Sequence, residues 1–354
     1  MSNDFSAKLS DKKCYFFDES NTLKFIDFLK TQAQVIAPHR KGENSYSYEI
    51  VDSASDVVLD YSRTIQPLKK FFLPPVETLL SFRISNNEYR EEHVPAIPRI
   101  FLGIHSYEMQ GIKRLDYSFI NGNPESNYLN RREESIFIGV SYVPDKYHFA
   151  KSLGIDIEET DGFCLFFEKA EGGYFVFEIN ERGARFLKNF GQGQPLNRTV
   201  SIEKQEFKSK IKYHYNRLPQ VFENVYHSKV WENVAERCVG CGTCNLLCST
   251  CYCFDVRDEV AMDADEGKRT RFWDGCMLNS FAAVAGGENF RDKLSSRTRH
   301  RLYRKFKYVT QASGELHCIG CGRCSKFCPA EINITEIIND LIDDFSEQQR
   351  KQVI

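Results

Sequence analysis

Apolar residues recur at two different spacings along the chain, and the spacing changes near residue 195. In the first part they form short runs rich in β-branched and aromatic residues, bounded by Gly, Pro, Asn and Asp, which is typical of strands joined by turns. These runs are residues 46–51, 99–104, 135–143, 163–168 and 173–179. Residues 21–32 and 75–82 show helical spacing instead, so we expect a mixed α/β domain here.

Helical spacing dominates beyond residue 195. The segments with apolar residues at three- and four-residue intervals are 203–218, 220–237 and 334–351. Asn333 and Glu336 are placed to cap the last of these helices. We therefore predict the fold class α+β: a mixed α/β scaffold or docking domain over 1–190, a linker over 191–201, and a helical ferredoxin-like domain over 202–354.

Length and charge limit the possible functions. The 354 residues are enough for two domains that each bury a core. The formal net charge of −2 gives no reason to expect a polyanionic partner. No run of eighteen apolar residues predicts a transmembrane helix, and the N-terminus shows no basic leader followed by an apolar stretch. We expect a cytoplasmic protein without membrane contact.

Cysteine is concentrated in one part of the chain. Eleven of the thirteen cysteines lie between Cys238 and Cys328. In a reducing cytosol, clustered cysteines hold metal more often than they form disulfides. Cys14 and Cys164 stand alone, and we expect both to be buried as small apolar residues.

Two cysteine runs share the spacing C-x2-C-x2-C-x3-C, and Pro329 follows the second run. This is the bacterial ferredoxin pattern for two [4Fe-4S] clusters, in which the fourth cysteine of each run binds the other cluster. Glycines inside the runs allow the backbone to approach the cluster. The predicted ligands are Cys238, Cys241, Cys244 and Cys328 for cluster 1, and Cys318, Cys321, Cys324 and Cys248 for cluster 2. Structural zinc is the alternative, but it usually takes two separated pairs of ligands.

Three further cysteines, Cys251, Cys253 and Cys276, lie outside this pattern. They are candidates for accessory ligands, for a redox-active thiol, or for packing beside the clusters. The seventy residues between the runs include two segments that are compatible with helices, 269–287 and 291–309. We therefore expect the clusters to be held between helices.

Eight Lys and Arg residues fall in segment 291–307. Such a run permits nucleic-acid binding, but the acidic stretch 255–266 and the near-neutral charge favour a solvated helix face that partly offsets the negative clusters, or a docking site for an acidic partner. Nucleic acid is therefore not an expected partner. No dinucleotide, phosphate-loop or nucleophile-elbow motif is present, so the chain shows no site for transforming a substrate.

The chain resembles the iron–sulfur β subunit of cytosolic nickel–iron hydrogenase/sulfur reductase complexes, and is also similar to the 4Fe-4S dicluster subunit of anaerobic sulfite reductase. The resemblance includes "KKFFLPPVETLLSF" (69–82), "IFLGIHSYEMQGIKRLD" (100–116), "VWENVAERCVGCGTCNLLCSTCYCFDV" (230–256), "RFWDGCMLNSFAAVAGGENFR" (271–291) and the final cysteine run. It implies an electron-transfer subunit that relays electrons between a catalytic subunit and a flavin-containing NAD(P)H oxidoreductase subunit. The catalytic partner would be a nickel–iron hydrogenase, a sulfite reductase or a heterodisulfide-reductase-like module.

The chain departs from that family in its first half. Many relatives carry cysteines at the positions of Tyr107 and Tyr142, and a Cys-Phe-Cys where this chain has His148, Phe149 and Ala150. The resemblance therefore implies two [4Fe-4S] clusters here rather than three. The alternative to a relay subunit is an iron–sulfur regulator that binds nucleic acid through the basic segment.

Overall fold

The computed structural model describes residues 9–196, 205–262 and 265–352. Three predictions lie partly or wholly outside this range. They are the absence of a leader at the N-terminus, the end of the linker at 197–201, and the first two residues of the helix expected over 203–218.

The first half of the chain is built on a seven-stranded sheet of order β1-β9-β8-β7-β6-β2-β3. The four central strands β8, β7, β6 and β2 are parallel, and the remaining pairings are antiparallel. The strands are β1 Cys14–Asp18, β2 Gln34–Gly42, β3 Ser45–Ile50, β6 Arg99–Ile104, β7 Ser135–Val140, β8 Leu165–Ala170 and β9 Gly173–Glu178. All five strands expected from the sequence are present in this sheet.

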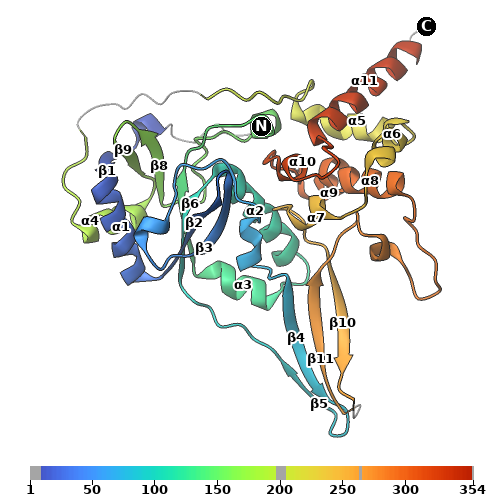
Figure 1. Cartoon of the computed structure of the whole chain (residues 1–354), viewed down its shortest axis with the longest axis horizontal. Helices are drawn as coiled ribbons and strands as arrows, with labels where there is room; N and C mark the ends of the chain where they lie inside the picture. Colours follow the sequence, from blue (N-terminus) through green and yellow to red (C-terminus); the bar gives the residue numbers. More distant parts are fainter. Residues whose placement is uncertain (1–8, 197–204, 263–264, 353–354) are drawn as a thin grey trace.

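Helices cover the sheet and complete the α/β layer, as Figure 1 shows. They are α1 Glu19–Gln32, α2 Ser106–Ile120, α3 Ser126–Glu133 and α4 Glu181–Phe190. The helix expected over 21–32 lies within α1, whose buried face includes Phe25 and Leu29. Cys14 and Cys164 are both buried in this core, as the sequence predicts.

A second, four-stranded antiparallel sheet projects from the molecule as an arm (Figure 1). Its order is β10-β11-β4-β5, with β4 Val76–Arg83, β5 Glu88–Glu91, β10 Phe254–Val260 and β11 Glu266–Trp273. The arm joins strands from both halves of the chain. The domain boundaries at 1–190, 191–201 and 202–354 stay a prediction.

The helix expected over residues 75–82 is wrong, because this segment is strand β4. The strand reverses the usual burial of apolar residues and exposure of charged ones: Val76 is 58% exposed, whereas Glu77 is buried. Glu77 forms ion pairs with Arg131 of α3 and with Arg271 of β11. Pairing with a strand almost 200 residues away therefore overrides the local spacing of apolar residues.

The second half of the chain is mainly helical, as expected. Its helices are α5 Leu218–Asn224, α6 Val230–Arg237, α7 Thr243–Leu246, α8 Leu294–Tyr303, α9 Val309–Ser313, α10 Arg323–Lys326 and α11 Ile334–Gln352, and a π-helical turn, Arg304–Tyr308, joins α8 to α9. The helix expected at 334–351 is α11. Its start carries the predicted cap, since Asn333 Oδ1 accepts from Thr335 N at 3.2 Å and Asn333 Nδ2 donates to Glu336 at 3.4 Å.

Two helix predictions in this half are wrong. The described part of 203–218 has no regular secondary structure as far as residue 214, because its backbone bonds to distant partners: Ile211 N donates to Ser152 Oγ at 3.1 Å, and Lys212 N donates to Asn339 Oδ1 at 2.9 Å. Residues 269–287 form the end of β11 and then a short 3₁₀ turn at Asn279–Ala282. The helix expected over 291–309 is present as α8 and the π-helical turn.

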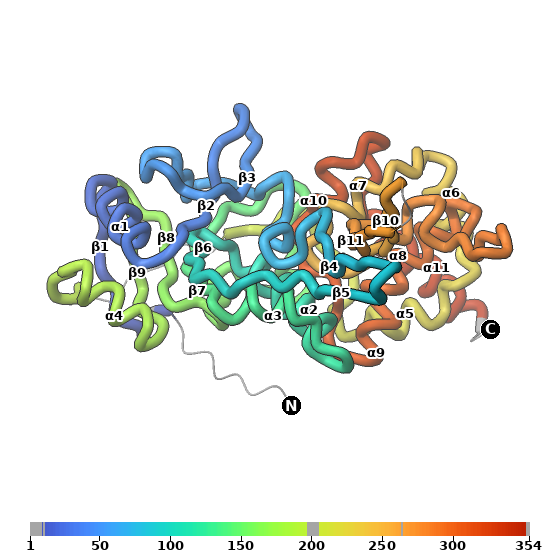
Figure 2. Tube along the Cα trace, turned by 90° about the horizontal axis from the view of Figure 1, so that it is seen from below, coloured from blue at the N-terminus to red at the C-terminus, as the bar shows by residue number. Residues whose placement is uncertain are grey.

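The two halves meet where the parallel strands of the large sheet end, and Figure 2 shows them side by side along the long axis. Helix α2 follows β6 and carries Glu108, which forms a fully buried ion pair with Arg323 of α10. Phe149 N donates to Gly320 O at 2.9 Å in the same contact. This edge of the sheet therefore lies directly against the second cysteine run.

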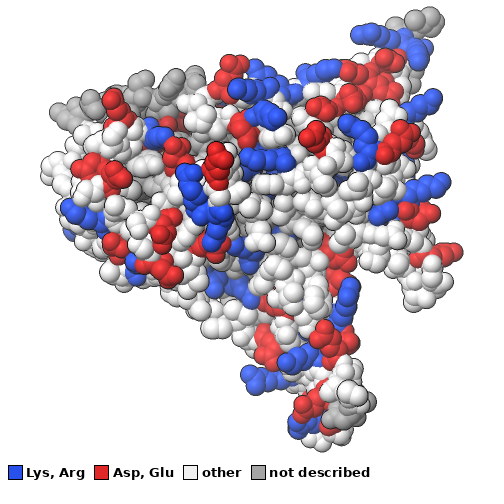
Figure 3. Space-filling model, viewed as in Figure 1, with Lys and Arg blue, Asp and Glu red and all other residues white. Residues whose placement is uncertain are grey.

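The surface on the face shown in Figure 3 carries Lys and Arg interspersed with Asp and Glu, including along the arm. This agrees with the formal net charge of −2. Among the described residues, no helix combines the length and the apolar character that a membrane crossing requires.

The buried pair yields a stability prediction. Glu108→Gln leaves the Arg323 guanidinium without its carboxylate in a dry interface, so we expect a loss of about 3 kcal/mol in unfolding free energy. The matched control is Asp156→Asn, which breaks the exposed Lys151–Asp156 pair and should cost less than about 1 kcal/mol. Anaerobic denaturant unfolding measures both variants, and equal losses would contradict a stabilising role for the buried pair.

Candidate iron–sulfur centre

The two cysteine runs have the same local structure. The first begins at Cys238, where α6 ends, and leads into α7; the second leads into α10. Each contains two glycines with positive φ, which are 65° at Gly320 and 70° at Gly322 in the second run. Glycine adopts this conformation without a steric penalty, so the loop can fold tightly around a bound group.

The four thiols predicted to hold cluster 1 line one cavity. Three come from the first run, and Cys328 reaches the same cavity from the second run. Cys324 also borders it, so the two predicted ligand sets are neighbours. The other lining side chains are mostly apolar, and they include Val234, Met277, Ile334 and Ile337.

The thiols predicted to hold cluster 2 are also close together. Burial raises the pKa of Cys318 to about 12, and the nearby thiols of Cys324, Cys321 and Cys248 add to this effect. Burial likewise raises the pKa of Cys321 to about 11. These buried sulfurs would be neutral thiols on their own, and they need cations at short range to become thiolates.

Two buried cations supply part of that charge. Arg301 of α8 opposes thiols of both sets: burial lowers its pKa, but Cys244, Cys324 and Cys248 more than offset burial and leave the pKa well above its ordinary value. Lys305 lies in the π-helical turn. Burial lowers its pKa, but Cys248 and other nearby thiols outweigh burial and raise the pKa above its ordinary value. Both side chains are at most 7% exposed.

These cations change the interpretation of segment 291–307. We expect a solvated helix face that partly offsets the negative clusters; the solvated face is wrong for Arg297, Arg301 and Lys305, which are buried and point inward. The sequence did contain a signal, because these three residues recur every four positions and so share one face of a helix. Opposite a predicted cluster site, that spacing indicates charge compensation.

The residues present fit a [4Fe-4S] cluster in each set. In the first set, four thiols line a mostly apolar cavity; in the second, the thiols are close together; and in both runs glycines let the backbone come close. Arg301 Nε and Thr298 Oγ1, on side chains that line the first cavity, have no hydrogen-bond partner among the described residues. In those residues, no group of three or more Cys, His, Asp or Glu has the geometry to bind a single metal ion.

The accessory cysteines lie beside thiols of both sets, with Cys276 near Cys244 and Cys251 near Cys248. Cys251 and Cys276 are buried, and Cys253 is partly exposed. Asn245 Nδ2 lies 3.7 Å from Cys251 Sγ and 3.4 Å from Cys276 Sγ. Sequence reasoning did not identify Asn245, and it also missed Lys69, whose buried ammonium donates to Cys251 O at 3.1 Å.

Comparison with known proteins agrees with this geometry. A model of the 4Fe-4S dicluster domain matches residues 237–332. Over 328 residues, the chain is 35% identical to "Sulfhydrogenase 2 subunit beta" of Pyrococcus furiosus, covering 90% of this chain and 95% of that protein.

The chain belongs to the sulfhydrogenase β-subunit family. It is an iron–sulfur electron-transfer subunit whose second half is a 4Fe-4S dicluster domain. The resemblance stated from the sequence is therefore confirmed. No solved structure matches the chain.

The four positions at which the resemblance implies a departure from the family lie together in space: Tyr107, Tyr142, His148 and Ala150. The rings of Tyr107, Tyr142 and His148 have centroids 5.1 to 5.5 Å apart. Ala150 belongs to the same buried cluster, together with the ligand candidate Cys321. Aromatic rings thus fill this space beside the second thiol set, and none of the four positions offers a thiol.

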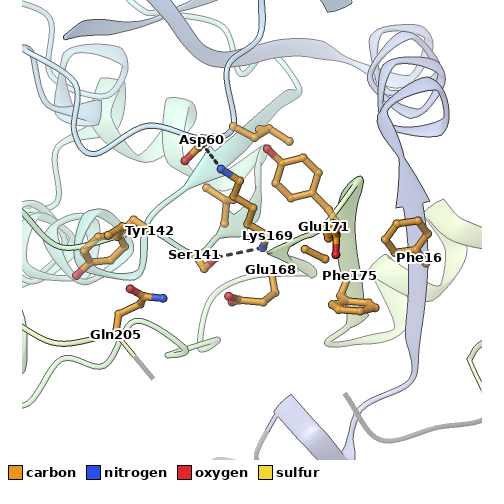
Figure 4. Close-up of a pocket in the computed structure, with 14 residues that line it drawn as sticks. Phe16, Asp60, Ser141, Tyr142, Glu168, Lys169, Glu171, Phe175 and Gln205 are labelled. Atoms are coloured by element: carbon orange, nitrogen blue, oxygen red, sulfur yellow. Dashed lines mark hydrogen bonds and ion pairs between the residues drawn. The ribbon is translucent and has the colours of Figure 1, made fainter. Parts of the chain in front are cut away.

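A separate cavity of about 620 Å³ lies on the large sheet and contains no cysteine (Figure 4). Lys169 pairs with Asp60 at this site, and its backbone N–H donates to Ser141 Oγ at 3.4 Å. Burial raises the pKa of Glu168 to about 7, and Glu168 Oε2 has no partner among the described residues. The cavity therefore holds a carboxyl group that titrates near neutral pH.

Glu168 should make stability depend on pH. Its folded-state pKa is raised from 4.5 to about 7. Its contribution to the free energy of unfolding is therefore fully present below about pH 4.5 and is lost as the pH rises through about 7. Glu168→Gln is neutral throughout, so the variant should gain on the order of 2 kcal/mol over the original chain between pH 5 and pH 8. Anaerobic thermal unfolding across this range measures the difference, and a gain independent of pH would contradict the raised pKa.

The second glycine loop can be tested by adding one methyl group. Gly320 has positive φ, and a Cβ there would collide with the backbone of Ala150. Gly320→Ala should therefore lower stability by about 2 kcal/mol and lower the iron bound by the second set. Gly193→Ala, where a Cβ meets open space, is the matched control and should change neither quantity. Normal iron content in Gly320→Ala would show that the loop tolerates a side chain.

Proposed function

We propose that the chain relays electrons through two [4Fe-4S] clusters, between a catalytic subunit of the nickel–iron hydrogenase type and a flavin-containing NAD(P)H oxidoreductase subunit. The placement of Cys328 carries the proposal, because this cysteine of the second run lines the cavity of the first run. Shared ligands of this kind tie two clusters into one compact unit. The P. furiosus relative, named as a subunit of a sulfhydrogenase, supports membership of a larger complex.

The chain's own residues would hold the clusters and set their charge balance. A [4Fe-4S] cluster supplies one-electron transfer, and its potential depends on net charge, hydrogen bonds and solvent exposure. Arg301 lies near thiols of both sets, so it lowers the cost of negative charge at either one. Apolar side chains line most of the first cavity, whereas Cys241 of that set is exposed to solvent.

The buried basic residues weigh against the alternative of a nucleic-acid-binding regulator. Arg297, Arg301 and Lys305 are each at most 8% exposed, so they cannot contact phosphates from the surface. They hydrogen-bond to backbone near the cysteines, as when Arg301 donates to Cys244 O at 3.4 Å. Their position fits charge compensation inside an electron carrier.

Pairs of cysteine variants test both the clusters and the crossed ligand scheme. Two [4Fe-4S] clusters predict about eight irons per chain, measured with sulfide after anaerobic purification. Cys241→Ala combined with Cys328→Ala removes two ligands of one cluster, so about four irons should remain. Cys321→Ala combined with Cys328→Ala affects both clusters, and little iron should remain.

Cys164→Ala is the control, since that lone buried thiol lies in the core of the large sheet. It should keep about eight irons. The reverse result, with more iron in the Cys321/Cys328 double variant than in the Cys241/Cys328 one, would refute the crossed scheme. Bound zinc in the unaltered chain would refute the relay itself.

A further inference from the structure

Five thiols remain outside the two predicted ligand sets, and three of them gather at the base of the arm. Cys251 and Cys253 precede β10, and Cys276 follows β11. Asn245 of α7 connects them, with its Nδ2 within 3.7 Å of Cys251 Sγ and 3.4 Å of Cys276 Sγ. Gly275 makes this approach possible, because a Cβ there would lie 2.7 Å from Asn245 Cβ.

Cys251 and Cys253 are in direct contact. Their side chains interact with each other, and the intervening residue, Tyr252, packs against the large core instead. Cys251 is 4% exposed, whereas Cys253 is partly exposed. One thiol of the pair is thus enclosed in the protein, and the other reaches toward solvent.

Two buried lysines lie beside this pair without a carboxylate. Lys69 is 2% exposed; it donates to Cys251 O at 3.1 Å, and its ammonium lies 4.0 Å from the Trp273 ring centroid. Lys305 donates to Thr250 O at 3.1 Å and to Thr250 Oγ1. In the described part of the chain, neither lysine forms an ion pair with Asp or Glu. A buried ammonium needs a nearby anion, and sulfur is the group available here.

The thiol pair is also connected to the second predicted cluster. Cys251 N donates to Cys248 O at 3.2 Å. Thr250 Oγ1 lies 3.4 Å from Cys248 Sγ and at the same time accepts from Lys305. Cys248 is a predicted ligand of cluster 2, and Cys251 follows it by three residues in the same turn. The pair therefore lies close to that predicted cluster.

We propose that Cys251 and Cys253 form a redox-active dithiol that exchanges electrons with the clusters. This inference rests on the proposed function. On oxidation both S–H bonds break, one S–S bond forms, and two protons leave through the exposed side at Cys253. The two electrons released would be taken up by the two oxidised clusters when these are bound, one electron each. The reverse step uses two reduced clusters and two protons to restore the thiols. Lys69, Lys305 and the Asn245 amide stabilise negative sulfur during both steps.

The couple would give a chain of one-electron carriers a two-electron site. Its chemistry suits a disulfide or sulfane-sulfur compound as an exchange partner, because the partly exposed Cys253 can be attacked by an external thiolate or can attack such a compound once reduced. Cys276 shares the Asn245 amide with Cys251, so we assign it a positioning role.

An electron count tests the proposal on the anaerobic holoprotein. Stoichiometric reduction of the oxidised protein should consume about four electrons, two for the clusters and two for the disulfide. Cys253→Ala should consume about two while keeping about eight irons. Cys253→Ser provides a second variant of similar volume, and Cys164→Ala, which removes a distant thiol, should still consume about four.

Alkylation of free thiols before and after reduction, followed by peptide mass spectrometry, locates the disulfide. We expect a Cys251–Cys253 bond only in the oxidised protein. Uptake of about two electrons by the unaltered chain, or free thiols at both positions after oxidation, would overturn the proposal. A loss of about four irons in Cys253→Ala would also overturn it, because it would identify Cys253 as a ligand of one of the two clusters. Failure of the proposed function would give a different result, because the unaltered chain would then hold fewer than eight irons.

Discussion

Negative charge on buried sulfur is stable only where cations lie beside it, and the organisation of the second half of the chain follows from that constraint. Arg301 and Lys305 project from one face of α8 and the π-helical turn, and their positive charge faces thiols from both runs. A π-helical turn is rare and is often found at functional sites, and here it continues the helix that brings Lys305 inward. Helix packing, loop shape and charge therefore serve the same group of cysteines.

The large sheet contributes to that centre through its edge. The carboxyl ends of the parallel strands meet the second cysteine loop, where Glu108 and Arg323 form their buried pair. Tightly packed rings of Tyr107, Tyr142 and His148 lie beside this loop. The first half thus positions the second loop through rigid contacts, and we expect it to contribute no cluster ligand of its own.

Sequence reasoning succeeded where local pattern decides structure. It identified the five strands, the helices α1 and α11, and the family, because alternation, helical spacing and cysteine spacing are local signals. It failed at β4, where a buried Glu77 between two arginines inverts the expected pattern, and at 203–218, where the backbone bonds to distant partners. It also missed Lys69 and Asn245, because their relation to the thiols exists only after the chain folds.

The central claim is that eight cysteines from two segments enclose two iron–sulfur cubanes. Mössbauer spectroscopy of anaerobically purified, ⁵⁷Fe-enriched protein tests it most directly, since it reports the type and the amount of every iron species. The account predicts that almost all iron is present as [4Fe-4S] clusters, at about eight irons per chain. A spectrum dominated by mononuclear iron or [2Fe-2S] clusters, or one accounting for a single cubane, would contradict it.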